Sequence, residues 1–214
     1  MRFRALFLVD TPEAVGNLDH AVDGILNAFH GLYDAVNAEA KGAFDFYAHP
    51  ITGLVLWIRN ARHHNSANRV RSIYRCARKE ENETNYILVD FAAGEAEEGG
   101  TFAEYYVSWA DILMVFEAQK RKYAESVERY RAALNADEIE GWCREHEYSE
   151  RQIFVNLLPI VSAAGSACTG AIAQYITPES VEAETFLDHF QTVQPADFSK
   201  PDYTELTSRL FWPS

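Results

Sequence analysis

The side chains of this chain best suited to chemistry stand together in the stretch Ile58–Asn65, which reads Ile-Arg-Asn-Ala-Arg-His-His-Asn. Arginine supplies a fixed cation that can hold a phosphate through two parallel hydrogen bonds. Histidine supplies a group that accepts and donates protons near neutral pH. Attack of a ribose 2′-hydroxyl on its neighbouring phosphate needs both a proton relay and a cation for the developing charge. The stretch therefore holds the residue types for cleavage of a phosphodiester.

The stretch lies in a cationic region of an acidic protein. No Asp or Glu occurs from Phe46 to Lys79, and this region carries seven positive charges. Because the whole chain carries −13, the remaining residues carry −20. A cationic region on an acidic protein indicates a polyanionic partner. The seven cations are Arg59, Arg62, Arg69, Arg71, Arg75, Arg78 and Lys79.

The spacing of Arg59 and His64 constrains how they could act together. They are five residues apart, which on a helix is about 500° of rotation, or roughly 140° off one face. An uninterrupted helix therefore cannot point both side chains at one small ligand. Two copies of the chain across a two-fold axis could form a shared cleft, and this favours a homodimer. Alternatively, the helix ends near Asn65 and His64 swings round.

The pattern Arg59-Asn60, three further residues and then His64 resembles the signature of the HEPN superfamily. Members are helical domains, commonly dimeric, and many are metal-independent endoribonucleases in toxin–antitoxin, phage-defence and RNA-processing systems. The resemblance implies that Arg59 holds the scissile phosphate, that His64 is the general acid and base, and that Asn60 orients the site. The motif covers about six residues. Ser66 stands where the toxin–antitoxin branch often has Tyr, and 150 residues follow His64, more than in many members.

The same resemblance implies RNA as the partner, a homodimer, and possession of an antitoxin or another neutralising protein. The side chains expected to contact RNA are Arg62, His63, Arg69, Arg71 and Arg75. Two other interpretations stay open. In one, the cations serve a non-catalytic interaction or nucleotide-binding protein. In the other, they only cap the carbonyl groups at a helix end.

The rest of the chain offers little competing chemistry. His63, His64 and His146 lack a metal-binding spacing such as HExxH, so we expect no metal and no cofactor. The three cysteines are odd in number and far apart, which favours a reducing cytoplasm. His20 and His30 belong to the first helix, where a solvated or core-edge role is expected. Asp34, Glu39 and Asp45 precede the motif, and any of them could pair with Arg59 or tune His64.

Two helices must position the motif. Thr11 and Pro12 suit a helix start, and apolar residues then recur at three- and four-residue steps from Leu18 to Val36, which predicts an amphipathic helix ending near Gly42. His49-Pro50 starts a second helix that carries Trp57 and the motif. The pattern therefore predicts a helical hairpin that presents the motif at one end.

A small sheet is expected after the motif. Val70–Cys76 fits a helix or a strand, and we expect a strand that pairs with Asn85–Phe91 through the polar turn Lys79–Thr84. A third strand over Phe102–Val107 is expected to follow. Ser108 then caps a long helix towards Leu134, and Asp137 opens a shorter one.

The segment Gln152–Pro178 has no charged residue in 27 positions. Its length permits a membrane span, but its middle has only small residues, which favours a buried helix or a dimer interface and no membrane. The predicted fold class is α+β, mainly α: a helical bundle with a small antiparallel sheet inserted after the motif helix. One HEPN-like domain is expected over residues 1–178, with a β-hairpin insert at about 67–107. Residues 179–214, which hold three prolines, are expected to form an extended C-terminal arm.

Overall fold

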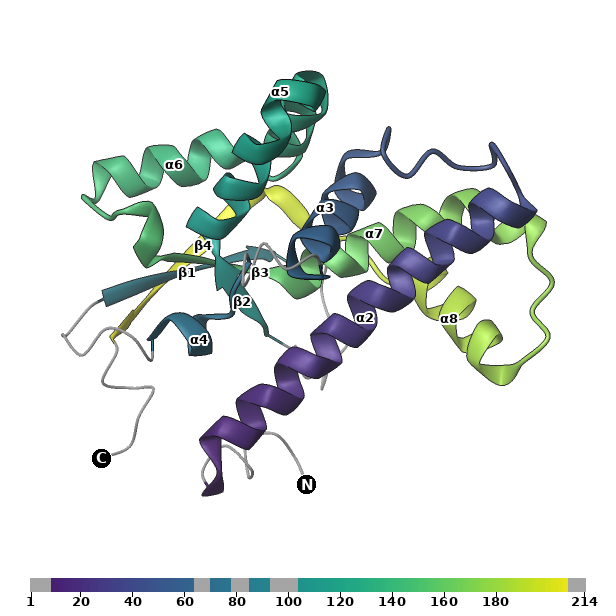
Figure 1. Ribbon diagram of the computed structural model, residues 1–214, viewed down its shortest axis with the longest axis horizontal. Helices are drawn as coiled ribbons and strands as arrows, with labels where there is room; N and C mark the ends of the chain where they lie inside the picture. The colour runs from purple at the N-terminus through teal and green to yellow at the C-terminus, as the bar shows by residue number, and fades with distance from the viewer. Residues whose placement is uncertain (1–8, 64–69, 78–84, 93–103, 208–214) are drawn as a thin grey trace.

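The computed structural model describes residues 9–63, 70–77, 85–92 and 104–207 (Figure 1). The fold is α+β and mainly α, as the sequence predicted, with helices gathered around a small four-stranded sheet. The helices of the described residues are α2 (Thr11–Glu39), α3 (Pro50–His63), α4 (Ile73–Ala77), α5 (Trp109–Ala133), α6 (Ala136–Glu145), α7 (Leu157–Ile172) and α8 (Val181–Thr192). The strands are β1 (Asn85–Ala92), β2 (Tyr106–Ser108), β3 (Ile153–Asn156) and β4 (Asp197–Thr207).

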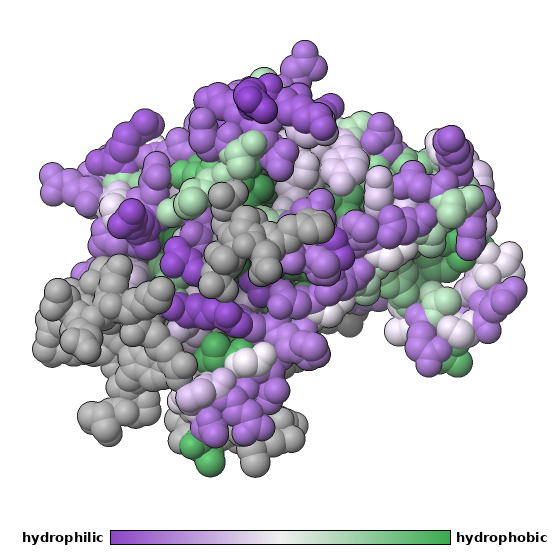
Figure 2. All heavy atoms as spheres, in the orientation of Figure 1, coloured by the Kyte–Doolittle hydropathy of each residue, from purple (hydrophilic) through white to green (hydrophobic). Residues whose placement is uncertain are grey.

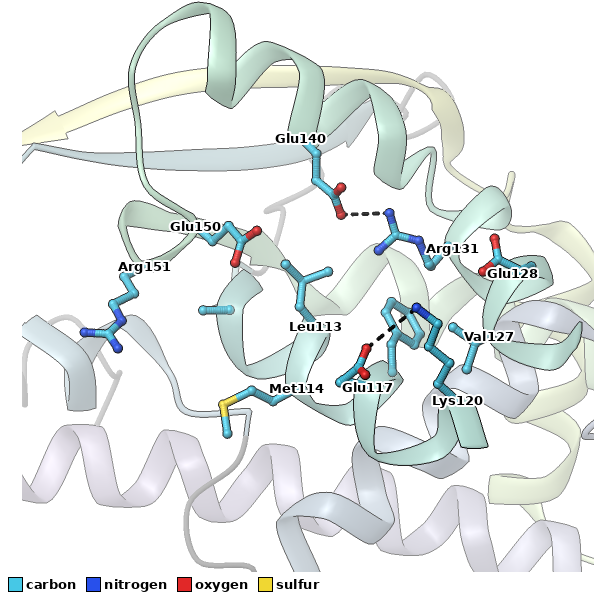
Figure 3. Close-up of a pocket in the computed structure, with 12 residues that line it drawn as sticks. Leu113, Met114, Glu117, Lys120, Val127, Glu128, Arg131, Glu140, Glu150 and Arg151 are labelled. Atoms are coloured by element: carbon cyan, nitrogen blue, oxygen red, sulfur yellow. Dashed lines mark ion pairs between the residues drawn. The ribbon is translucent and has the colours of Figure 1, made fainter. Parts of the chain in front are cut away.

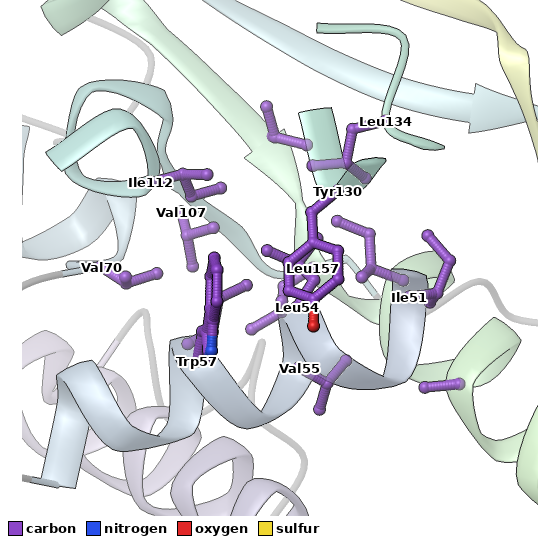
Figure 4. Close-up of a cluster of buried hydrophobic side chains, with 14 of the residues drawn as sticks. Ile51, Leu54, Val55, Trp57, Val70, Val107, Ile112, Tyr130, Leu134 and Leu157 are labelled. Atoms are coloured by element: carbon purple, nitrogen blue, oxygen red, sulfur yellow. The ribbon is translucent and has the colours of Figure 1, made fainter. Parts of the chain in front are cut away.

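Helix α3 is the centre of the core. All of its residues from Ile51 to Ile58 are buried, on every face, because α2, α5 and α7 each pack against it. A helix that is apolar all round needs such complete cover. Figure 4 shows Leu54, Val55 and Trp57 of α3 beside Tyr130 of α5. The predicted helical hairpin of α2 and α3 is therefore confirmed, and the end of α3 that carries the motif is anchored by a packed element.

Helix α2 begins as expected, with one difference at its cap. The side chain of Asp10, rather than that of Thr11, accepts the hydrogen bond from the Glu13 backbone at 3.0 Å. A buried stripe along α2, including Val22, Leu26 and Phe29, faces the core, as the apolar periodicity predicted.

The sheet is mixed rather than antiparallel, with strand order β2-β3-β1-β4. β1 confirms the predicted strand at residues 85–91, but it pairs in parallel with β3 and antiparallel with β4. Alternate residues of β1 serve two faces: Ile87 and Val89 enter the main core, and Tyr86 packs with Ile73 and Phe154 on the other side. The sheet is thus built from four separate parts of the chain instead of one insert after the motif.

The prediction of a strand at Val70–Cys76 is wrong. Ser72 makes one isolated bridge to Val107, and Ile73–Ala77 then form the short helix α4. The helical alternative of the pattern wins because Ile73 covers the second face of the sheet. The turn expected at Lys79–Thr84 lies outside the described residues, and the expected third strand is realised only as β2.

The described part of the C-terminal segment, residues 179–207, does not form an extended arm. Residues 181–192 form α8, and residues 197–207 form β4, the edge strand beside β1. Trp142 of α6 anchors this strand, because its ring stacks on Tyr203 at 4.3 Å with only 4° between the planes. Phe190 of α8 lies so close to Gly165 of α7 that a side chain at 165 would overlap it. The small residues of α7 therefore serve a helix contact within the chain.

One described segment, Leu157–Tyr175, is long and apolar enough to cross a membrane by length and composition, a test that the core helix of a soluble protein also passes. Here α7 packs against α3 and α8, which agrees with the expected buried helix. Hydrophilic side chains dominate the face of the molecule shown in Figure 2.

Candidate functional site

The motif occupies the last turns of α3, where burial falls away along the chain. Ile58 is fully buried, Arg59, Asn60 and Arg62 are half-buried, and His63 is exposed. His64 and Arg69, two of the residues predicted for the site, lie outside the described residues. The structure therefore bears on the cationic half of the expected Arg59–His64 pair.

Arg59 is held by two amide side chains. Its Nε donates to Oδ1 of Asn27 on α2 at 3.0 Å, and its Nη1 donates to Oδ1 of Asn60 at 3.2 Å. Asn60 also lies near the side chain of Tyr47, whose pKa is raised, chiefly by burial and then by neighbouring Tyr33. Both acceptors of Arg59 are neutral. The guanidinium is fixed in direction while its positive charge is kept for another anion.

Arg62, the next cation, is committed to structure. Its Nε donates to Oδ1 of Asp23 at 2.7 Å, its Nη1 donates to the Val70 carbonyl at 2.7 Å, and its guanidinium lies 5.8 Å from the centre of the Tyr105 ring. Burial opposes its charged form, but Tyr105 and Asp23 outweigh burial and raise the pKa of Arg62. Val70 has φ 63°, a left-handed conformation that is rare for a β-branched residue. Arg62 thus stabilises the strained backbone conformation of Val70 by donating to its carbonyl.

Arg71 makes an ion pair near the motif in which two hydrogen bonds join the side chains. Its Nε and Nη2 donate to the two carboxylate oxygens of Asp111 on α5, at 2.8 and 2.9 Å, and its backbone N–H donates to the same carboxylate at 2.9 Å. The hydrogen bonds to Asp111 raise the pKa of Arg71 even though burial works against them. This fork joins α5 to the segment before α4.

Arg75 of α4 pairs with a buried carboxylate. Asp19 of α2 is 2% exposed and accepts hydrogen bonds from both Arg75 and the hydroxyl of Tyr105. A buried carboxylate is costly unless it is paired and hydrogen-bonded, and these two donors meet that need. The pair therefore helps to fix α2 to the sheet side of the molecule.

These contacts pair most of the described arginines of the cationic region with carboxylates of the same chain. Of the four arginines of this region in the described chain, Arg62, Arg71 and Arg75 have carboxylate partners, whereas the acceptors of Arg59 are amides. Sequence reasoning missed these partners, which come from α2 and α5. A signal existed for those on α2, since Asp19, Asp23 and Asn27 stand at four-residue steps and so share one face.

A pocket of about 490 Å³ lies away from the motif, between the two halves of α5, α6 and the turn before β3 (Figure 3). Apolar side chains such as Leu113 and Val127 line it together with charged residues that pair with one another. Arg131 contacts Glu140 at 2.9 Å, and Lys120 contacts Glu117 at 3.9 Å. Within the described ranges, no group of three His, Cys, Asp or Glu side chains is placed to hold a metal ion.

No family model, no curated protein and no solved structure matches this chain.

Proposed function

We propose that the protein is a metal-independent endoribonuclease of HEPN type, in which Arg59 binds the scissile phosphate and His64 transfers protons. The observation that carries the proposal is the setting of Arg59. Its two acceptors are the amide oxygens of Asn27 and Asn60, at 3.0 and 3.2 Å. A guanidinium held by neutral acceptors can still neutralise a phosphate, whereas the charge of one held by a carboxylate is already largely offset by that carboxylate.

The assignment of Asn60 follows from the same contacts. Its amide oxygen accepts from Arg59, and its side chain lies near that of Tyr47. In this proposal Asn60 orients the site by positioning the cation of Arg59. Arg62, Arg71 and Arg75 support the site by fixing α2, α4 and α5 around it through their carboxylate partners. These partners also offset the positive charge that the three arginines would otherwise offer to RNA.

The proposal keeps two copies of the chain in the active enzyme, since Arg59 and His64 diverge on a continuous helix. It also keeps RNA as the substrate, a neutralising protein partner, and a cytoplasmic location, where the free thiols of Cys143 and Cys168 are stable. Sedimentation at high micromolar concentration tests the first point. A strict monomer would remove the shared cleft.

Cleavage of single-stranded RNA in the presence of EDTA tests the activity. Arg59→Ala should lower the rate by about 10²–10³-fold, through loss of charge stabilisation. His64→Ala should lower it by about 10²–10⁴-fold, and more than His63→Ala does. Arg144→Ala is the matched control, because it removes one exposed arginine from α6. Its rate should equal that of the wild type.

Two outcomes would count against this function. If the wild type leaves RNA intact under all these conditions, the protein is better described as a non-catalytic binding module. If Arg144→Ala lowers the rate as much as Arg59→Ala, the effect reports overall charge instead of a site at Arg59.

A further inference from the structure

A polar stripe runs along α2 beside α3. Asp23, Asn27, His30 and Asp34 follow one another at steps of four, three and four residues, so they fall within about 60° of the helix circumference. Asp23 holds Arg62 and Asn27 holds Arg59. His30 and Asp34 therefore continue the line that already binds the cations of α3.

His30 and Asp34 form an acid–base pair. His30 Nδ1 lies 3.1 Å from Asp34 Oδ2, and the imidazole packs edge-on against Tyr33 with the ring centres 5.6 Å apart. A carboxylate on Nδ1 favours the tautomer in which Nε2 accepts a proton. The His30 side chain is 25% exposed and that of Asp34 is 63% exposed, so solvent and a ligand can reach the pair.

Tyr47 connects this pair to Arg59. Its hydroxyl lies near Asn60, which holds Arg59, and near Asp34, and both residues influence the pKa of Tyr47. On the α2 side, His30 is one turn from Asn27, and residues at that spacing lie about 5–6 Å apart between Cβ atoms. Arg59 and His30 thus approach the same surface between α2 and α3 from two elements of one chain.

We infer that Arg59 and the His30–Asp34 pair form a phosphodiester site within a single chain, with Arg59 binding the phosphate and His30 acting as the general base. The inference rests on the proposed ribonuclease function and keeps Arg59 as the phosphate-binding residue, but it assigns the role of general base to His30 instead of His64. It also meets a difficulty of the Arg59–His64 spacing, which on an uninterrupted helix would place the two side chains roughly 140° apart. Arg59 and His30 need no second chain.

The step is a transesterification. His30 Nε2 takes the proton of the ribose 2′-hydroxyl, whose oxygen forms a bond to phosphorus while the bond from phosphorus to the 5′ oxygen breaks. The 5′ oxygen takes a proton from water, and His30 later releases its proton to solvent. The products are a 2′,3′-cyclic phosphate and a 5′-hydroxyl. Arg59 faces the charge that grows on the phosphate oxygens.

The ionisable groups around His30 decide how it responds to a bound anion. On its own helix it faces Asp34, with Asp23 two turns away, and Arg59 and Arg62 come from α3. Tyr33 and Tyr47 complete the surroundings. An anion on Arg59 adds negative charge beside the imidazole, so anion binding there should perturb the resonances of His30.

Histidine NMR provides a test that does not depend on activity. The probes are inorganic phosphate and uridine 3′-monophosphate, and His30→Gln assigns the resonances. Both probes should shift the His30 signals at a fixed pH. His20, an exposed histidine on the same helix, is the matched control and should not respond. Arg59→Gln should abolish the response of His30.

Single-turnover cleavage of RNA is the second arm. His30→Gln should slow cleavage by about 10²-fold or more, and His20→Gln should leave it unchanged. If the probes leave the His30 signals in place, or move His20 equally, the single-chain site is wrong. It is also wrong if His30→Gln cleaves at the wild-type rate, although the ribonuclease proposal then stands on His64. If the wild type cleaves no RNA while the probes act on His30 through Arg59, the anion site stands and the ribonuclease proposal fails.

Discussion

The hydroxyl of Tyr130 lies directly over the Cα of Gly53, so close that any Cβ at position 53 would overlap it. Tyr130 is fully buried on α5, and its hydroxyl donates to the Tyr47 carbonyl at 2.7 Å. Its ring also packs 4.5 Å from that of Trp57 (Figure 4). The close contact of α3 and α5, which holds the motif helix in the core, therefore requires a glycine in the middle of α3.

We predict that Gly53→Ala destabilises the protein by about 2 kcal/mol, because overpacking outweighs the gain of about 1 kcal/mol in helix propensity. Gly31→Ala on α2 is the matched control, since nothing lies within 4 Å of a Cβ there. That variant should be neutral or more stable. Urea unfolding measures both free energies, and equal stability of the two variants would show that Tyr130 moves away at no cost.

Some elements were predictable because their signal is local. The apolar steps of α2, the uncharged and largely apolar run at residues 51–58 and the β-branched residues of β1 each identify an element without knowledge of its partner. The position of the motif at the end of a packed helix followed from the same pattern. The existence of these elements was therefore settled before any tertiary contact was known.

The partners of these elements were not predictable. β1 pairs with β3, more than 60 residues further along, and with β4, a charged segment that contains Pro201 and shows no clear alternation. Proline is tolerated there because β4 is an edge strand. The ion-pair partners Asp19, Asp23 and Asp111 likewise depend on tertiary packing, so the arginine-rich region resembled an open cationic surface in the sequence.

Our second prediction concerns pH. Burial lowers the pKa of His49, whose Nδ1 is buried and has no hydrogen-bond partner among the described residues. Below about pH 6.5 the unfolded chain therefore binds a proton at His49 more readily than the folded chain does. The contribution of His49 is complete above that pH and is lost as pH falls towards its folded pKa.

Thermal unfolding at pH 7.5 and pH 5.5 tests this contribution. The decrease in Tm from the higher to the lower of these two pH values should be smaller in His49→Phe than in the wild type. This variant keeps a ring packed beside Phe44 but cannot titrate. His189→Asn is the control, because it removes an exposed histidine from α8 and should keep the wild-type decrease. If His49→Phe shows the full decrease, another group causes it.

The last prediction addresses whether the arginines beside the motif serve folding or binding. Asp111 is 4% exposed and Arg71 is 37% exposed, and two parallel hydrogen bonds join them. Removing one partner of such a pair leaves an uncompensated charge, which costs about 3–5 kcal/mol in a fully buried pair and less where one partner is partly solvated. We therefore expect Asp111→Ala to cost about 2–3 kcal/mol in the free energy of unfolding.

Arg71→Lys separates geometry from charge at the same place. Lysine keeps the positive charge but cannot form the parallel pair of hydrogen bonds, so this variant should lose about 1 kcal/mol or more in urea unfolding. Its affinity for RNA at fixed salt should stay near that of the wild type. Arg144→Lys on α6 provides the reference for an exposed arginine and should lose almost nothing. A stable Arg71→Lys variant with weakened RNA binding would instead make Arg71 part of the binding surface, as the sequence pattern alone suggested.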